Sequence, residues 1–379
     1  MLTSFEVHGF RAFSQLTIER LGRVNLIVGK NNSGKSSLLE ALRVYRTAGS
    51  PFVLGEILRA HDEVLNPSDM GLEVAQLAAL FHGRNPRPFS DKISLGPKSA
   101  PQQRLVLRPV FVRDGLNPIR SQPAGTSEEV TEEAAAADPN VRAALSIELG
   151  GREMCVDADM ISGRRSRMTG LGQGPTWISA TGADNELVSR WWDVIVLNPE
   201  SENRVVKCLR PIAPVERMTL VERPERRGRM FMVRLKGETG STPLRSFGDG
   251  MARMFQIAIA MEFASRTGFV WAWMSQWSIG ESLPLAPTLL LDEAENGIHY
   301  SVLADFWRFV FKVAQQNGVQ VFATSHSWDC IEGFQVAASE NSAADGVLIR
   351  LERHDQGTKA VLFDADELRI VSRDEIEVR

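Results

Sequence analysis

The stretch GKNNSGKS, from Gly29 to Ser36, decides how this sequence of 379 residues folds. It follows VNLIV at 24–28, a short apolar run typical of a buried strand, and it leads into a helix-like segment that ends at Tyr45. The order G-x-x-x-x-G-K-S between a strand and a helix is that of a phosphate-binding loop, because its glycines let backbone N–H groups curl around phosphate oxygens. The sequence therefore predicts a nucleoside triphosphate site on an α/β fold.

Individual positions of this loop have separate roles. We expect Lys35 to place its charge on the β- and γ-phosphates and Ser36 to present its hydroxyl to Mg²⁺. The helix that begins here adds the positive end of its dipole. The candidate nucleotide-binding residues of the loop are Gly29, Asn31, Asn32, Ser33, Gly34, Lys35, Ser36 and Ser37.

Two further motifs follow apolar strands later in the chain. After TLLL at 288–291, Asp292 is expected to bind Mg²⁺ and Glu293 to act as the base or to position water. After VQVFAT at 319–324, His326 is expected to contact the γ-phosphate, because ligands of α/β sheets gather at the carboxyl ends of strands. The candidate catalytic residues are Glu293, His326 and Lys35.

In this order the motifs resemble those of the ABC-type P-loop ATPases of the chromosome-maintenance, recombination and OLD (overcoming-lysogenisation-defect) group. GFRAF at 9–13 is similar to an N-terminal element of that group, which implies that Arg11 contacts nucleotide. ATSHSWD at 323–329 is similar to its His switch, and the acids after TLLL to its Walker B motif. The resemblance implies a homodimer in which two heads sandwich two ATP–Mg²⁺, with a higher assembly left open.

LRSFGDGMARM at 244–254 is similar to the signature motif, which in this group touches the γ-phosphate bound to the opposite head. A Ser usually opens that motif, but Gly248 stands in its place here and Ser246 lies two residues earlier. Phosphate contact by the Ser246 hydroxyl and contact by the glycine backbone both stay open. The implied nucleotide-binding residues are Ser246, Gly248, Asp249 and Gly250, and the Q-loop residue is one of Gln76, Gln102 and Gln103.

The resemblance and the pattern of elements together predict an ABC-ATPase head, with a mostly parallel sheet and an antiparallel β lobe. Residues 1–60 are expected to form its N-terminal part and 236–379 its C-terminal part, which closes with a hairpin of 347–354 and 359–364. Residues 61–235 are expected to form an inserted α+β lobe, with at most a short helical arm near 186–211. Fourteen of the 18 prolines lie between Pro67 and Pro224, which excludes a long coiled coil.

Composition excludes other classes of protein. The 43 basic residues nearly balance the 47 acidic ones, so the net charge of −4 does not indicate a nucleic-acid protein. No apolar run approaches the ~20 residues of a membrane span, and the N-terminus lacks the layout of a signal peptide. Three isolated cysteines, without metal-site spacing, are typical of a reducing compartment. We therefore expect a cytoplasmic protein without membrane contact.

A basic segment at 217–236, with ERRGR as the tip of a hairpin, is the candidate DNA contact. A solvated basic turn is the alternative interpretation of the same segment. The residues concerned are Arg223, Arg226, Arg227 and Arg229.

The residues that follow His326 are too few for the Toprim nuclease domain that OLD proteins carry. We therefore expect an ATPase switch that regulates a separate effector, a Toprim-type nuclease of an antiphage defence system. A recombination-mediator ATPase that acts directly on DNA is one alternative. A scaffold that binds nucleotide without hydrolysing it is the other.

Overall fold

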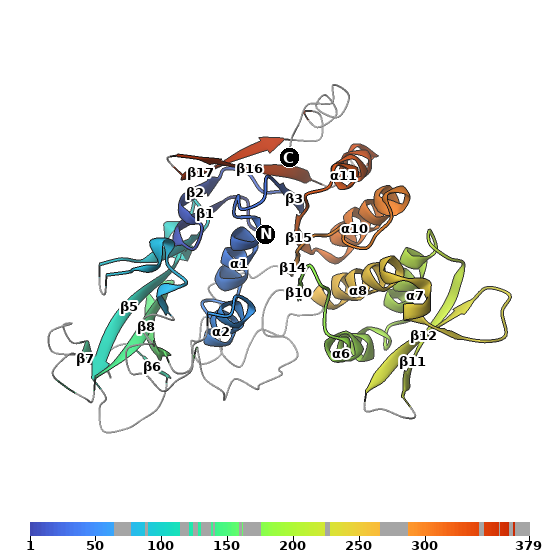
Figure 1. Ribbon diagram of the computed structural model, residues 1–379, viewed down its shortest axis with the longest axis horizontal. Coiled ribbons are helices and arrows are strands. Elements are labelled where there is room, and N and C mark those ends of the chain that lie inside the picture. The colour runs from blue at the N-terminus through green and yellow to red at the C-terminus, as the bar shows by residue number, and fades with distance from the viewer. Residues whose placement is uncertain are drawn as a thin grey trace.

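The computed structural model describes most of the chain in three sheets and the helices around them (Figure 1). Gln76, Arg226 and Arg227 lie outside the described residues. No described helix is long and apolar enough to span a membrane. The described residues are 1–63, 77–87, 90–113, 121–123, 128–129, 138, 141–158, 161, 176–223, 228–265, 287–340, 345–355, 357–363 and 367.

The core sheet has six strands in the order β10-β14-β15-β3-β16-β17. All neighbours pair in parallel except β16 and β17, which form the antiparallel hairpin that the sequence predicts. Every residue of β3, β14 and β15 is buried, as expected for a parallel sheet covered on both faces. The strands are β3 (Val24–Val28), β10 (Thr176–Ile178), β14 (Thr288–Leu291), β15 (Gln320–Thr324), β16 (Gly346–His354) and β17 (Gly357–Phe363).

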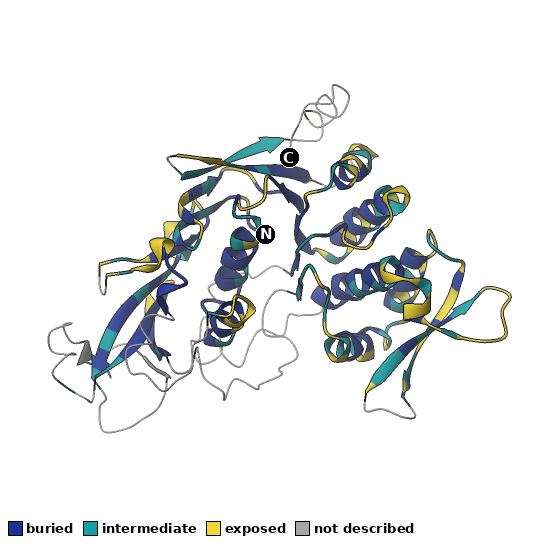
Figure 2. Ribbon diagram, in the orientation of Figure 1, coloured by how far each residue is buried: buried dark blue, intermediate teal, exposed yellow. Residues whose placement is uncertain are grey.

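Helices cover the two faces of this sheet because alternate strand residues enter two different cores (Figures 1 and 2). Leu26, Leu289 and Val321 pack with α8 (Asp249–Ala264), α10 (Leu303–Asn317) and α11 (Trp328–Glu340). Their neighbours Ile27, Leu290 and Phe322 pack with α1 (Lys35–Arg46) and α2 (Pro51–Ala60). The P-loop helix α1 and the helix of the signature segment, α8, therefore lie on opposite faces of the core sheet.

The second core also contains an eight-stranded antiparallel sheet, the β lobe that the sequence predicts. It begins with the β1–β2 hairpin, whose turn contains Arg11, and continues through strands from the middle of the chain. The strands are β1 (Phe5–Phe10), β2 (Phe13–Ile18), β4 (Ile93–Gly96), β5 (Leu105–Arg113), β6 (Ser121–Pro123), β7 (Glu128–Glu129), β8 (Val141–Leu149) and β9 (Arg152–Asp157). Short 3₁₀ turns lie at His82–Arg84, Pro101–Gln103 and Tyr300–Val302.

The third group of elements surrounds α8. Helices α6 (Asn185–Ile195) and α7 (Pro199–Leu209) bury Trp191, Trp192 and Leu209 in the α8 core. They are followed by β11 (Val215–Glu222), β12 (Arg229–Leu235), β13 (Thr242–Pro243) and the 3₁₀ turn Leu244–Phe247. The two helices do not project as an arm, because their apolar faces pack on α8.

The middle of the chain is not a single inserted lobe. The sequence predicts one lobe over 61–235, but the described strands of this range belong to all three sheets. In particular, β10 pairs in parallel with β14 and extends the core sheet. Three residues are too few for a periodic pattern, and the strand is stabilised by its pairing with a buried neighbour. Among the described residues the longest helix is α8, with 16 residues, which agrees with the exclusion of a long coiled coil.

Candidate active site

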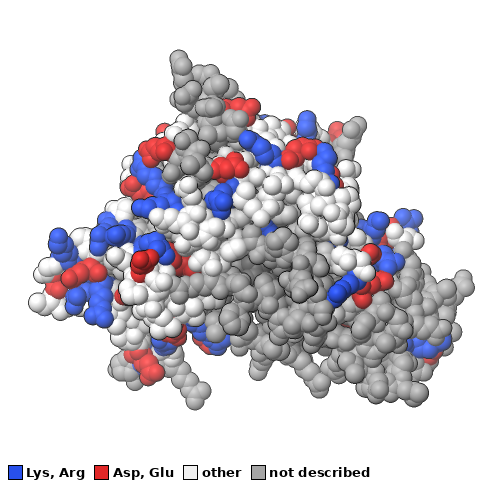
Figure 3. Space-filling model, turned by 180° about the vertical axis from the view of Figure 1, so that it is seen from behind, with Lys and Arg blue, Asp and Glu red and all other residues white. Residues whose placement is uncertain are grey.

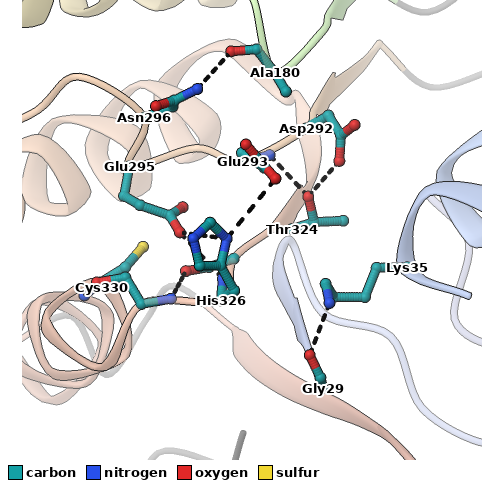
Figure 4. Close-up of polar contacts among 12 residues, drawn as sticks. Gly29, Lys35, Ala180, Asp292, Glu293, Glu295, Asn296, Thr324, His326 and Cys330 are labelled. Atoms are coloured by element: carbon teal, nitrogen blue, oxygen red, sulfur yellow. Dashed lines mark hydrogen bonds and ion pairs between the residues drawn. The ribbon is translucent and has the colours of Figure 1, made fainter. Parts of the chain in front are cut away.

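Three loops meet at one edge of the core sheet. The register pairs Ile27 of β3 with Thr324 of β15, and Ala323 of β15 with Leu291 of β14. The loops that begin at Gly29, Asp292 and Ser325 therefore leave adjacent parallel strands at the same edge (Figure 4). The structure thus brings the predicted P-loop, the two acids and His326 together.

The backbone conformation of the P-loop requires both of its glycines, Gly29 and Gly34. Gly29 has a φ of 145° and Gly34 a φ of 99°, in the region that favours glycine. A Cβ on Gly29 would lie 2.6 Å from the carbonyl oxygen of Leu351, and one on Gly34 would lie 2.7 Å from Cζ of Phe13. The loop is therefore closely packed between the β16 strand and the β1–β2 hairpin.

The amino end of α1 offers unfilled hydrogen-bond donors. Gly34 caps this helix without a side-chain hydrogen bond, and its first turn contains no acidic residue. The Ser33 hydroxyl is buried without a hydrogen-bond partner, whereas Asn31, Asn32 and Ser36 are exposed and Ser37 is half-buried. Free N–H groups and a positive helix end suit anionic oxygens. The loop therefore fits the phosphates of a nucleotide.

The acidic cluster, consisting of Asp292, Glu293 and Glu295, follows β14. Thr324 fixes the first two residues of this cluster: its hydroxyl donates to Oδ1 of Asp292 over 2.6 Å and accepts from the amide of Glu293 over 2.8 Å (Figure 4). The backbone of Glu293 has a φ of 47°, a left-handed conformation that costs about 1–2 kcal/mol in a residue with a side chain. Such a conformation persists only where the surroundings hold it.

His326 faces this cluster from the end of β15. Its Nδ1 lies 3.8 Å from Oε1 of Glu293 and 3.5 Å from Oε1 of Glu295, and its amide donates to Glu295 over 3.1 Å. The His326 side chain is 57% exposed, whereas that of Glu295 is 9% exposed. His326 is therefore accessible to a ligand, and Glu295 holds the loop that carries it.

Lys35 lies across from the acidic cluster. Its Nζ donates to the carbonyl oxygen of Gly29 over 2.7 Å (Figure 4). It also donates to the carbonyl oxygen of Lys30 over 3.1 Å. Burial lowers the pKa of Lys35, and the charges of the acidic cluster act in the opposite direction. Within the described part of the chain only backbone carbonyls hold this ammonium group, so it can exchange them for phosphate oxygens without breaking an ion pair.

Two family models match the parts of the chain that form this site. The model described as "AAA ATPase domain" matches residues 1–66, which contain the P-loop. The model described as "AAA domain, putative AbiEii toxin, Type IV TA system" matches residues 216–329, which contain α8, the acidic cluster and His326. Among solved structures, the Smc head bound to the C-winged helix domain of ScpA shares the fold, with a TM-score of 0.50 and 10% identity over 96% of this chain and 98% of that chain. The chain therefore matches AAA family models over residues 1–66 and 216–329 and shares the fold of the Smc head.

Other similar proteins match less well or over a shorter range. The SMC head domain from Thermotoga maritima is 14% identical, with a TM-score of 0.44 over 96% of this chain and 99% of that chain. An uncharacterised protein from Methanocaldococcus jannaschii is 43% identical over 54 residues, which make up 14% of this chain. The chain spans only 25% of the length of that relative.

The predicted signature segment, 244–254, lies at the amino end of α8. Ser246, Gly248 and Asp249 are exposed, and Gly250 is packed so closely on the loop after Walker B that a Cβ would lie 2.6 Å from the carbonyl oxygen of Gly297. Gly248 has a φ of 88° and caps α8 without a side-chain hydrogen bond. Among the described residues, no hydrogen bond or ion pair joins these residues to the P-loop of the same chain.

Arg11 lies in a buried ionic cluster next to α1. Its Nε is 3.0 Å from a carboxylate oxygen of Glu40 and its guanidinium donates to Glu63 over 2.7 Å, with 7% of the side chain exposed. His61 also contacts Glu40, over 2.6 Å, and this hydrogen bond raises the pKa of His61. Because two carboxylates hold Arg11 here, its contact with nucleotide stays a prediction.

The basic segment is partly neutralised within the chain. Arg229 forms two hydrogen bonds with Asp193, of 2.6 and 2.7 Å, and Arg234 contacts Glu216 over 3.1 Å. On the face shown in Figure 3, described basic side chains lie beside acidic ones. Arg223 is described and half-buried, and DNA contact by this segment stays a prediction.

The predicted site omits three residues that the structure places in it: Thr324, Glu295 and Arg253. Arg253 is 5% exposed and reaches from α8 to the acidic cluster, where it donates to the carbonyl oxygens of Asp292 and Glu293. A signal for it existed, because a charge within the apolar run MARMFQIAIAM requires buried partners. Thr324 and Glu295 carried no such signal, since their partners lie far away in the sequence.

Proposed function

We propose that this ATPase hydrolyses ATP with Mg²⁺ and that two copies close head to head around two nucleotides. One observation carries the proposal. Helices α1 and α8 both begin after a glycine with positive φ, and neither has a side-chain cap, but only α1 carries the P-loop lysine. A nucleotide between two copies would fill the free donors of α1 from one head and those of α8 from the other.

The residues at the sheet edge have complementary roles in this proposal. Lys35 and the α1 amides bind the phosphates, and the Ser36 hydroxyl with the Asp292 carboxylate would hold Mg²⁺. Bound Mg²⁺ supplies positive charge that offsets the charge developing on the transferred phosphoryl group. Glu293 accepts the proton of the attacking water, and His326 contacts the γ-phosphate.

We place this cycle upstream of a separate effector in the cytoplasm. Opening and closing of the dimer would control a nuclease of the Toprim type in antiphage defence. The link to a partner protein is supported by the family model whose description names a putative AbiEii toxin of a Type IV TA system, whereas the nuclease class and the antiphage role rest on the resemblance to OLD proteins. Co-purification from the native host tests this part, and recovery of the ATPase without any second protein in the presence of ATP would contradict it.

The catalytic part is tested with Glu293→Gln. This change removes the base but keeps the shape of the side chain, so we expect phosphate release to stop while ATP binding remains. The trapped complex should be a dimer by light scattering. Lys35→Ala is the matched control, and it should lose binding and dimerisation together. A Glu293→Gln protein that stays monomeric with saturating ATP would contradict the sandwich.

Two alternatives make different predictions. If the protein is only a nucleotide-binding scaffold, its phosphate release should be no higher than that of the Lys35→Ala variant. An ATPase acting directly on DNA would bind DNA with an affinity that falls steeply with salt. The ion pair of Arg229 with Asp193 reduces the charge available for such contact.

A further inference from the structure

The signature helix and the Walker B turn of one chain contact each other at two points. The first is the close approach of Gly250 to Gly297. The second is Arg253, one helical turn further along α8, whose guanidinium reaches the backbone of the acidic cluster. The helix that begins with the signature is therefore fastened to the turn that carries the proposed base.

The hydrogen bonds of Arg253 join two separate segments of the chain. One terminal nitrogen donates to the carbonyl oxygen of Ser179 over 2.7 Å, beyond the end of β10. The other donates to the carbonyl oxygens of Asp292, over 2.7 Å, and Glu293, over 3.0 Å. Burial lowers the pKa of Arg253, and the charges of the acidic cluster oppose this effect. A buried cation is thus used to hold backbone carbonyls at the catalytic turn.

A purely structural anchor for α8 exists elsewhere. Near the other end of the helix, Glu262 is fully buried and accepts two hydrogen bonds from Arg204 of α7, of 2.6 and 2.8 Å. The described partners of Arg204 are Glu200, Ser201 and Glu262, none of which belongs to the acidic cluster. The two arginines therefore differ in what they hold, although both fasten the same helix.

Arg253 helps to hold Glu293 in an unfavourable left-handed backbone conformation. Glu293, with a φ of 47°, is held on its amide side by Thr324 and on its carbonyl side by Arg253. The direction of its side chain follows from the backbone angles at this residue. Any movement of α8 that shifts the guanidinium of Arg253 therefore changes its hydrogen bond to the carbonyl oxygen of Glu293.

We propose that Arg253 is a positioning residue that ties the orientation of the Glu293 carboxylate to the position of the signature helix. This inference rests on the proposed hydrolysis of ATP by a closed dimer. When the signature segment contacts the nucleotide of the opposite head, α8 shifts. Arg253 then transmits this shift to the backbone of Glu293 in its own head. Each head then hydrolyses its nucleotide only after it has engaged its partner.

The test compares Arg253→Lys and Arg253→Gln with Arg204→Gln in the full chain. A lysine carries its donors on a single nitrogen, so it cannot reproduce the two-nitrogen bridge from Ser179 to the acidic cluster. We therefore expect both Arg253 variants to lose about tenfold or more in kcat, with KM for ATP within about threefold of the original value. In the Glu293→Gln background, Arg253→Lys should still give the ATP-dependent dimer. Turnover per head of the unchanged protein should rise with protein concentration, because dimers form. Turnover per head of the Arg253→Lys variant should not depend on protein concentration. Arg204→Gln should lower the melting temperature and leave kcat unchanged below it.

Several results would overturn the inference. Arg253→Lys with unchanged kcat and concentration dependence would show that Glu293 does not need the guanidinium. A second contradicting result would be that both Arg253 variants fail to bind ATP or to fold, and a third that Arg204→Gln loses kcat. Either of these two results would show that Arg253 only anchors α8. A failure of the proposed function is distinguishable, because the unchanged protein itself would then release no phosphate, and the inference would fall with it.

Discussion

The hydroxyl of Thr324 donates a hydrogen bond of 2.6 Å to Oδ1 of Asp292 and so joins the ends of two neighbouring strands. The same hydroxyl accepts from the amide of Glu293 over 2.8 Å. One side chain thus orients the proposed Mg²⁺ ligand and the backbone of the proposed base. The other carboxylate oxygen of Asp292 remains for a cation.

Replacing Thr324 with Val keeps the shape of the side chain but removes the bridge. Because groups that orient a metal ligand typically contribute 10–100-fold to affinity or activity, we expect kcat to fall by about that factor and the Mg²⁺ requirement to rise. Phosphate release measured against Mg²⁺ concentration tests this. Thr324→Ser retains the hydroxyl and should restore most of the activity; equal activity of the two variants would exclude a role for the bridge.

Gly34 is required by two separate effects, and a paired substitution separates them. Gly34→Ala meets both an unfavourable φ of 99° and the Phe13 ring at 2.7 Å. Gly150→Ala meets only an unfavourable φ of 61°, with nothing within 4 Å of the added Cβ. We expect unfolding free energies lower by about 2–4 kcal/mol for Gly34→Ala and about 1 kcal/mol for Gly150→Ala, measured by urea denaturation. Similar losses would show that the Phe13 contact relaxes easily.

His326 should matter for activity and not for stability. Its side chain is 57% exposed, and its Nδ1 lies 3.5 Å or more from the carboxylate oxygens of Glu293 and Glu295. We expect His326→Ala to reduce kcat by about 10²-fold, the usual cost of removing one contact to a developing charge. The free energy of unfolding should change by no more than about 0.5 kcal/mol. A large loss of stability with normal turnover would give His326 a structural role instead.

The sequence predicts β3, β14, β15 and α1 because their signals are local. Each of the three strands is a continuous apolar run, and burial on both faces of a parallel sheet produces that run. The P-loop is equally local, since the positions that need glycine lie within eight residues. The resemblance to ABC-type ATPases then predicts the order of the remaining motifs around the sheet, and the two family models match residues 1–66 and 216–329, which contain these motifs.

The parts that sequence reasoning missed depend on contacts between distant segments. The pairing of β10 with β14 joins residues about a hundred positions apart, and no pattern in Thr176–Ile178 announces it. Arg11 belongs to GFRAF, which is similar to an N-terminal element of ABC-type ATPases, but its partners Glu40 and Glu63 lie in separate parts of the chain. Propensity and periodicity describe one segment at a time, so they do not identify such partners.

The pair of His61 and Glu40 predicts a stability that depends on pH. The hydrogen bond that the His61 ring donates to the Glu40 carboxylate raises the pKa of His61, so the folded protein holds this proton more tightly than the unfolded chain. The stabilisation is therefore complete below the ordinary histidine pKa of about 6.5 and is lost as pH rises through the higher pKa of the folded state. Because the His61 side chain is 41% exposed, we expect no more than about 1 kcal/mol. The difference in unfolding free energy between the unchanged protein and His61→Gln should be larger at acidic than at alkaline pH, and a difference that grows with pH would contradict the assigned pair.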